Sequence, residues 1–217
     1  MKEYHVLNLG AGVQSTYLYL LFAKGEILDE EGKPIVLDCA IFADTGEEPL
    51  PVYEHLQWLQ AQDGPEIWVR SKGVLGDDLM KGENSDGGRF ASVPFFAKVE
   101  GNDSPGMTRR QCSMEYKIEP IVKAIRQELV GVLPRKWFPK KDVCVHQYIG
   151  MSFDECRSAL RVKKNFAKNT PWSTAHFPLI EMELMRSEII EKLKGLVPHE
   201  TPSAELTGSK QPEKGTT

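Results

Sequence analysis

A short glycine-containing stretch near the N-terminus is the first place in this 217-residue chain where the residue types suggest chemistry. After an apolar run at 4–10, Gly10 and Gly12 lead into Ser15 and Thr16, where a second apolar run begins. Glycines let a backbone approach an anion closely, and the free amides of a helix N-terminus point at it. The pattern is typical of a phosphate-binding loop or of a plain turn between a strand and a helix. The candidate loop residues are Gly10, Ala11, Gly12, Gln14, Ser15 and Thr16.

This loop differs from the two commonest phosphate-binding motifs. It has no lysine after the glycines, as G-x-x-x-x-G-K-[ST] requires, and it lacks the third glycine of G-x-G-x-x-G. A Walker-type ATPase and a dinucleotide-binding enzyme are therefore disfavoured. Taken alone, the loop supports the phosphate site and the plain turn equally.

The predicted strand segment at 35–46 ends in a second polar turn, with the letters ADTG, which contains Asp44, Thr45 and Gly46. In an open parallel sheet, ligands bind beyond the carboxyl ends of the strands. Asp44 is therefore expected to meet the same ligand as the first loop. Considered by itself, an aspartate that caps the next helix is the simpler interpretation.

A third group of candidates surrounds the start of a predicted helix at 114–129 and consists of Arg109, Arg110, Cys112 and Lys117. Cations near a helix N-terminus oppose the helix dipole, so helix stability does not explain the adjacent arginines. Arginine suits bidentate recognition of phosphate or sulfate. The glycine-rich stretch before them favours this function over a solvated basic loop. Cys112 is either a thiolate stabilised by these neighbours or a small buried apolar residue.

The remaining pattern predicts the elements that must position these residues. Short apolar runs alternate with segments of helical spacing, which is typical of a mostly parallel sheet with helices on its faces. A polar, glycine-rich insertion at 81–108 interrupts this order, and such insertions are functional or mobile. The predicted strands are 4–10, 35–46, 66–70 and 143–150. One predicted helix starts at Ser15, and others cover 48–62, 114–129 and 186–195.

The last candidates follow the strand at 143–150. Ser152 and Glu155 form a predicted capping box, which makes Asp154 and Glu155 first-turn acids of the next helix. Arg157 is placed where it could face the site, whereas His146 is better explained as a packed histidine. We expect one domain at 1–196 and a disordered tail at 197–217, where apolar residues are sparse.

Composition narrows the classes of protein that remain. A hydrophobic content of 41%, a charged content of 27% and a net charge of −4 are ordinary for a globular protein. No apolar stretch approaches the ~18 residues of a membrane span and no signal peptide is evident, so a cytoplasmic location is expected. The four cysteines contain no C-x-x-C pair and the five histidines are scattered, which argues against disulfides and a protein-held metal site.

Two segments interleave basic and aromatic residues, namely PRKWFPKK at 134–141 and RVKKNFAK at 161–168. Surfaces that track a nucleic-acid backbone and stack its bases have this composition. Solvated loops with packed aromatic side chains are the simpler interpretation of each segment.

Four ordered segments resemble the phosphoadenosine phosphosulfate reductase family, in the PP-loop or adenine nucleotide alpha hydrolase superfamily, and specifically its phage or actinobacterial type. They are LGAGVQST, FADTGEEP, TRRQCSMEYKIEPI and IGMSFDECRSAL, and FPLIEMELMRSEIIEKL is similar to the lead-in to the family's last helix. The resemblance spans residues 4–196. It implies a Rossmann-like three-layer fold with a mostly parallel five-stranded sheet, and ATP or a sulfated adenylate (PAPS or APS) across the carboxyl edge.

The same resemblance implies roles for the candidates. The loop from Gly10 to Ser15 would hold phosphates and Asp44 would lie near the nucleoside. Arg109, Arg110 and Lys117 would neutralise phosphate or sulfate charge. In ATP-using members, attack at the α-phosphorus releases pyrophosphate and activates a substrate oxygen as an adenylate. Magnesium is expected as a counter-ion that bridges phosphate oxygens.

The chain departs from the family pattern in ways that bear on its reaction. Gln14 stands where the common loop has aspartate, and Ala11 replaces a glycine. No cysteine follows Cys156, so thiol-dependent sulfonucleotide reduction and an iron–sulfur cluster are disfavoured. We therefore expect an ATP pyrophosphatase or adenylating enzyme, with sulfonucleotide reduction and a non-catalytic nucleotide- or nucleic-acid-binding module as alternatives. A nucleic acid or a sulfur-carrier protein is a candidate partner, and a homo-oligomer is compatible with the sequence; no membrane partner is expected.

Overall fold

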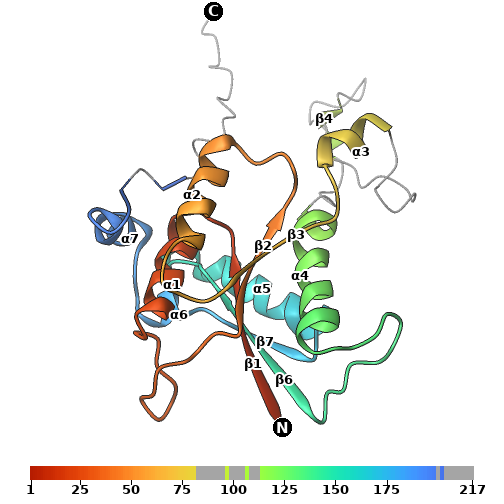
Figure 1. Cartoon of the computed structure of the whole chain (residues 1–217), viewed down its shortest axis with the longest axis horizontal. Helices are drawn as coiled ribbons and strands as arrows, with labels where there is room; N and C mark the ends of the chain where they lie inside the picture. The colour runs from red at the N-terminus through yellow and green to blue at the C-terminus, as the bar shows by residue number, and fades with distance from the viewer. Residues whose placement is uncertain (82–95, 98–105, 108–112, 199–200, 203–217) are drawn as a thin grey trace, which may run out of the picture.

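A single all-parallel sheet forms the centre of the protein in the computed structural model, which describes residues 1–81, 96–97, 106–107, 113–198 and 201–202. Its strand order is β3-β2-β1-β6-β7 (Figure 1). The five strands are β1 (Lys2–Leu9), β2 (Cys39–Asp44), β3 (Ile67–Ser71), β6 (Val143–Ile149) and β7 (Ser173–His176). The expected α/β class and five-stranded parallel sheet are confirmed.

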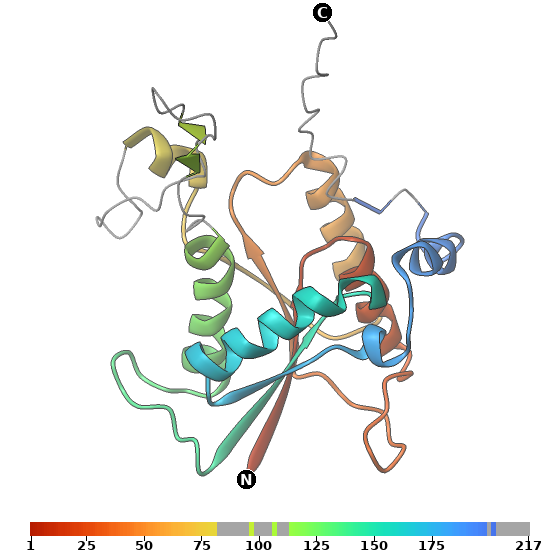
Figure 2. The ribbon, with the colours of Figure 1, turned by 180° about the vertical axis from the view of Figure 1, so that it is seen from behind.

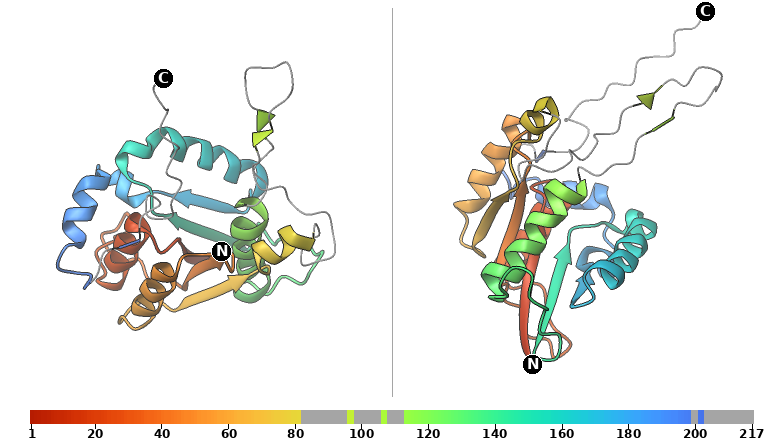
Figure 3. Two further views of the ribbon diagram at one scale, coloured as in Figure 1. Left: turned by 90° about the horizontal axis from the view of Figure 1, so that it is seen from above. Right: turned by 90° about the vertical axis from the view of Figure 1, so that its right-hand side faces the viewer.

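Helices cover both faces of this sheet, which gives three layers (Figures 2 and 3). The first face carries α1 (Val13–Ala23), α2 (Leu50–Gln60), α6 (Pro178–Glu181) and α7 (Arg186–Leu193). The second face carries α5 (Cys156–Asn169) and a helix built from η1 (Ser113–Ile118), α4 (Glu119–Lys123) and η2 (Ala124–Leu129). Outside the layers lie α3 (Leu75–Lys81), the short η3 (Phe153–Glu155) and the antiparallel pair β4 (Phe96–Ala97) and β5 (Gly106–Met107).

Alternation along the strands divides the core between the two faces. In β1, Leu7 and Leu9 pack with the apolar residues of α1, whereas Val6 packs on the other side against Ile125 of η2. Successive side chains of a strand point to opposite faces, so β1 needs apolar residues at nearly every position. This explains why the sequence showed a continuous apolar run there.

The chain reverses its direction of winding between β1 and β6, which are neighbours in the sheet. The segment after β1 enters α1 on the first face, and the segment after β6 enters α5 on the second. Loops that leave adjacent parallel strands toward opposite faces open a crevice at the carboxyl ends of the strands. The fold therefore opens a crevice beside Gly10, at the place where open α/β sheets commonly bind ligands.

Some predicted boundaries differ from the structure. β2 begins at Cys39 rather than at 35, because residues 28 and 34 pair with each other in an antiparallel bridge before the strand. α3 and β7 had no counterpart among the predicted elements, since β7 is only four residues long and partly polar. Pro120 lies in the first turn of α4, where a missing backbone N–H is tolerated, after the wide turns of η1.

Two predictions concern segments that the structure describes only in part. Most of the insertion at 81–108 and of the tail at 197–217 lies outside the described residues. Val197 and Pro202, which are described, are both buried. Within the described residues, none of the helices has the length and apolarity needed to cross a bilayer.

Candidate functional site

The turn between β1 and α1 is held by one hydroxyl. The Ser15 Oγ accepts hydrogen bonds from the backbone N–H of Gly10 at 3.3 Å and of Gly12 at 3.2 Å. Ala11 between them has a φ of 51°, in the left-handed region that non-glycine residues rarely adopt. Strained backbone of this kind clusters at ligand-binding positions, where surrounding contacts hold it in place. Ser15 is therefore the residue that fixes the loop's shape.

A pocket of about 250 Å³ opens over this turn, and we call it the phosphate-loop pocket. Two cationic side chains reach it from distant parts of the chain, Lys117 from η1 and Arg186 from the start of α7. Its lining residues are Gly10, Ala11, Gly12, Val13, Gln14, Glu48, Val52, Lys117, Arg186 and Pro202. The pocket combines open helix N-terminal backbone with positive charge, which is the combination that binds anions.

The loop that follows β6 packs directly against the phosphate loop. A Cβ atom on Gly150 would lie 2.7 Å from the backbone nitrogen and Cα of Ser15, so only glycine fits. The Gln14 side-chain amide spans the same contact and donates to Glu155 at 3.0 Å and to Ser152 at 3.4 Å. The two loops of the crevice are thereby locked together, and Gln14 serves as the link.

Lys117 enters the pocket paired with a carboxylate. Its Nζ lies 3.0 Å from Oε1 of Glu48, which also accepts a hydrogen bond from the Thr45 hydroxyl at 3.2 Å. The neighbouring Tyr116 is fully buried, and its hydroxyl donates to Asp78 of α3 at 2.5 Å. That buried bond fixes the start of η1. The Lys117 side chain is 54% exposed, so water weakens its ion pair with Glu48. An anionic ligand can therefore replace Glu48 as the partner of the Lys117 ammonium.

Asp44 and Gly46 form the turn after β2, and Asp44 does not cap the next helix, because the N-cap of α2 is Pro49 and no side chain bonds to it there. The Asp44 carboxylate accepts hydrogen bonds from the Gly46 N–H and from the Tyr53 hydroxyl, each at 2.8 Å. Gly46 has a φ of 74°, and a Cβ there would lie 3.0 Å from Val74. Burial, together with the bond to Asp44, raises the pKa of Tyr53. None of these residues lines the phosphate-loop pocket.

Several predicted site residues are not brought into the pocket. Thr16 is fully buried and its hydroxyl lies 2.7 Å from Nε2 of His55, inside the core. Arg157 is exposed on α5 and does not line the pocket. Asp154 accepts the backbone N–H of Arg186 at 3.1 Å, so it positions the start of α7. Arg109, Arg110 and Cys112 lie outside the described residues.

Three residues of the site were missed by sequence reasoning, namely Gly150, Glu48 and Arg186. Each lies inside a segment that had drawn attention, but none stands in a pattern that predicts a ligand. The one available signal was a basic residue at the start of a helix, which the helix dipole disfavours. Arg186 has that position in α7.

The described cysteines lie away from this pocket and contribute no reactive thiol to it. Burial raises the pKa of Cys39 to about 12, and it also raises the pKa of Cys144. The Cys156 thiol donates to the Phe153 carbonyl at 2.7 Å. Among the described residues, no group of three or more histidine, cysteine, aspartate or glutamate side chains is arranged to hold a metal ion.

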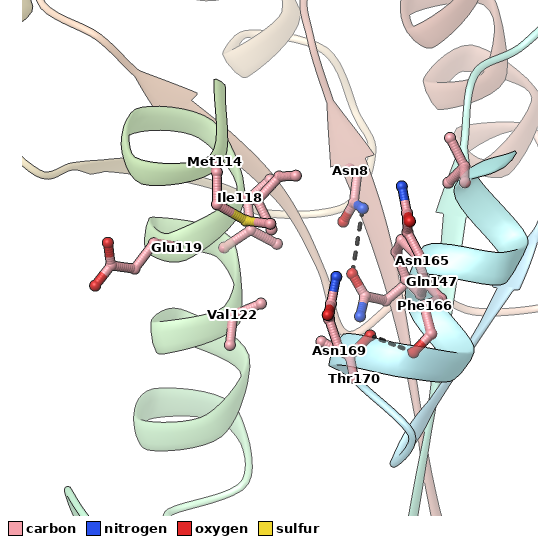
Figure 4. Close-up of a pocket in the computed structure, with 12 residues that line it drawn as sticks. Asn8, Met114, Ile118, Glu119, Val122, Gln147, Asn165, Phe166, Asn169 and Thr170 are labelled. Atoms are coloured by element: carbon pink, nitrogen blue, oxygen red, sulfur yellow. Dashed lines mark hydrogen bonds between the residues drawn. The ribbon is translucent and has the colours of Figure 1, made fainter. Parts of the chain in front are cut away.

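A second pocket, of about 430 Å³, lies on the other face of the sheet between the η1–α4 helix and α5, and we call it the inter-helix pocket (Figure 4). Apolar side chains of the two helices form its walls, and amide side chains of β1 and β6 form its floor. Its lining residues are Asn8, Met114, Ile118, Glu119, Ile121, Val122, Gln147, Val162, Asn165, Phe166, Asn169 and Thr170. Lys117 and Ile118 are consecutive, so one helix borders both pockets.

Comparisons with protein-family models, with curated proteins and with solved structures found no match for this chain.

Proposed function

We propose that the protein binds an adenine nucleotide, ATP or an adenylyl sulfate, with its phosphates in the phosphate-loop pocket. The observation that carries this proposal is the turn at Gly10–Gly12, which lies in the crevice between β1 and β6 beneath two cationic side chains. A glycine turn, a helix N-terminus and cations recruited from remote segments together favour an anionic ligand over a plain turn. The sequence resemblance adds the adenine nucleotide to that general expectation.

The proposed reaction is chemistry at the α-phosphate. A substrate oxygen attacks the α-phosphorus, the bond to the bridging oxygen breaks, and pyrophosphate leaves with the electron pair. The backbone amides at the start of α1 bind the phosphates, and Lys117 and Arg186 neutralise the charge that builds on the leaving group. The acceptor is a nucleic acid or a sulfur-transfer substrate.

Magnesium would supply further neutralisation of the phosphates in this proposal. The phosphate-loop pocket contains one carboxylate, Glu48. Magnesium at nucleotides is held largely by phosphate oxygens and water, with one or two carboxylates from the protein. Glu48 therefore fits as the residue that would hold the ion, and Lys117, its partner in the ion pair, would then be released toward the phosphates.

The test is incubation with labelled ATP and magnesium, with and without nucleic acid, and measurement of pyrophosphate and AMP. We expect release of both, and ATP binding weakened about tenfold or more in Lys117→Ala and Arg186→Ala, because each removes a charge-assisted contact. Lys194→Ala is the matched control, since Lys194 pairs with Glu191 on the surface outside the pocket. Unchanged ATP affinity in both pocket variants would overturn the proposal.

Sulfonucleotide reduction is the enzymatic alternative, and the cysteines disfavour it. The chain has no cysteine after Cys156, whose thiol donates to a backbone carbonyl. Thiol-dependent release of sulfite from an adenylyl sulfate would establish this alternative in place of ATP chemistry.

A nucleic-acid-binding surface is favoured by a separate observation at the loop before β6. Trp137 is 97% exposed beside a pocket of about 360 Å³. The basic residues that line this pocket are Arg126, Arg135, Lys136 and Lys140. An exposed indole among cations is the arrangement that stacks on bases and tracks phosphates. Binding of single-stranded RNA that weakens steeply with salt would support this second function.

A further inference from the structure

The inter-helix pocket has the shape of a slot. Met114, Ile118 and Val122 of the η1–α4 helix project toward α5, which presents Phe166 across the gap (Figure 4). A volume of about 430 Å³ is in the range of small-molecule sites, which are mostly apolar with a few fixed polar groups. Apolar side chains that face each other across a pocket suit the two faces of a flat ring.

The floor of the slot is a chain of hydrogen bonds with a defined direction. The Ser173 hydroxyl donates to the Thr170 carbonyl at 3.2 Å and therefore accepts from Nε2 of Gln147, at 3.0 Å. This turns Oε1 of Gln147 toward Asn8, whose Nδ2 donates to it at 3.2 Å. We call this chain, from the Thr170 carbonyl through Ser173 and Gln147 to Asn8, the amide relay. Because an amide has one acceptor side and one donor side, each step fixes the orientation of the next.

The relay ends on an unpaired acceptor. Oδ1 of Asn8 is buried and has no hydrogen-bond partner among the described residues, whereas Nδ2 of the same amide bonds to Gln147 (Figure 4). Buried polar atoms are nearly always paired, and an unpaired one is destabilising. The atom belongs to a residue that lines the slot, so the missing partner is expected from a molecule that enters it.

We propose that the inter-helix pocket binds a planar heterocycle that carries an N–H donor, such as an aminopurine or aminopyrimidine ring, with the donor bonded to Oδ1 of Asn8. The ring has two possible sources. It is either the base of the nucleotide whose phosphates occupy the neighbouring pocket, in which case the inference rests on the proposed function, or the ring of a second substrate.

The test compares two nucleosides that differ only at the donor. Adenosine carries the 6-amino group, and purine riboside has the same ring without it. We expect the protein to bind adenosine about tenfold more tightly, the ratio for one hydrogen bond to an otherwise unpaired buried acceptor. Asn8→Leu should bind the two nucleosides equally. Asn165→Leu, which changes an exposed amide of the same pocket, should retain the preference.

A second variant acts through the relay and leaves Asn8 in place. Ser173→Ala removes the group that orients Gln147, so the preference for adenosine should fall while the affinity for purine riboside stays the same. Equal binding of the two nucleosides by the unmodified protein, no binding of either, or a preference that survives Asn8→Leu would overturn the proposal.

Competition with ATP identifies the source of the ring. If the ring is the nucleotide's base, ATP displaces adenosine, and Lys117→Ala weakens ATP but not adenosine. If the ring belongs to a second substrate, adenosine binds to the ATP complex. A protein that prefers adenosine but binds no ATP would contradict the proposed function and leave this inference standing. A protein that binds ATP but does not prefer adenosine to purine riboside would contradict this inference and leave the proposed function standing.

Discussion

Strands β1, β6 and β7 contribute one polar cluster to each face of the sheet, and the two clusters differ in kind. On the face of α4 and α5 lies the amide relay, whose members carry no charge at any ordinary pH. On the face of α1 lies a histidine cluster that consists of His5, His146, His176 and Tyr148. Adjacent residues of a strand point to opposite faces, so His146 and Gln147 separate the two clusters by one position.

The histidine cluster is packed as well as hydrogen-bonded. The rings of His5 and His146 stack with centroids 4.9 Å apart, and Nδ1 of His146 lies 2.9 Å from Nε2 of His176. Burial, reinforced by the neighbouring histidines, lowers the pKa of His5 and lowers that of His176 to about 4. One strand thus presents an uncharged chain of hydrogen bonds on one face of the sheet and a proton-sensitive packing element on the other.

The largest loss of stability is expected from a substitution at Gly150, directly after the end of β6. In Gly150→Ala the new methyl group would meet the Ser15 backbone at 2.7 Å, and neither backbone can move without opening the crevice. Overpacking of this kind destabilises a protein by about 1–3 kcal/mol. We expect a melting temperature several degrees lower and a loss of nucleotide binding. Gly10→Ala is the control for stability, since its Cβ would meet nothing closer than 3.7 Å.

The next largest effect is acid destabilisation through the histidine face. Burial and the neighbouring histidines lower the pKa of His176 from its ordinary value of 6.5 to about 4 in the folded protein. The unfolded chain therefore binds more protons between these values, and stability present above pH 6.5 is lost as the pH falls toward 4. Urea midpoints measured across this window should fall by less in His176→Gln than in the unmodified protein. If the urea midpoint fell equally in the variant and in the unmodified protein, groups other than His176 would be responsible for the acid sensitivity.

A substitution in the relay should destabilise the protein independently of pH. Gln147 is 2% exposed, and Gln147→Leu would leave Asn8 and Ser173 without their partner. Unsatisfied buried groups cost about 1–3 kcal/mol. We expect urea midpoints lowered by the same amount at pH 5 and pH 8. If the decrease varied with pH, the assumed independence of the two faces would be wrong.

The smallest effect on stability is expected at the basic loop before β6, which touches neither cluster. Trp137 is 97% exposed, so Trp137→Ala should leave the melting temperature unchanged. Stacking of one base on an aromatic side chain is worth about 1–3 kcal/mol, so the affinity for single-stranded RNA should fall about tenfold. The matched control is Leu133→Ala, an exposed apolar residue of the same loop. RNA binding that is absent or unaffected would remove the nucleic-acid function from consideration.

The sequence pattern predicted four of the five strands of the sheet and the loop over it, because these are local patterns, whereas the short β7 was missed. The apolar run before Gly10 and the spacing of the first three strands predicted the parallel core. The site was harder, since its contacts join distant positions. The bond from Gln14 to Glu155 spans 141 residues and the one from Asn8 to Gln147 spans 139. Nothing in the spacing of single residues indicates that Gly150 must be small or that Arg186 reaches the pocket.

Lys117 and Ile118 stand side by side in η1, and each lines a different pocket. A ligand that shifts η1 by drawing Lys117 inward would also shift Ile118 in the wall of the other pocket. Occupancy of the two pockets would then be cooperative. By thermodynamic reciprocity, the factor by which phosphate binding changes the affinity for the ring equals the factor by which the ring changes the affinity for phosphate.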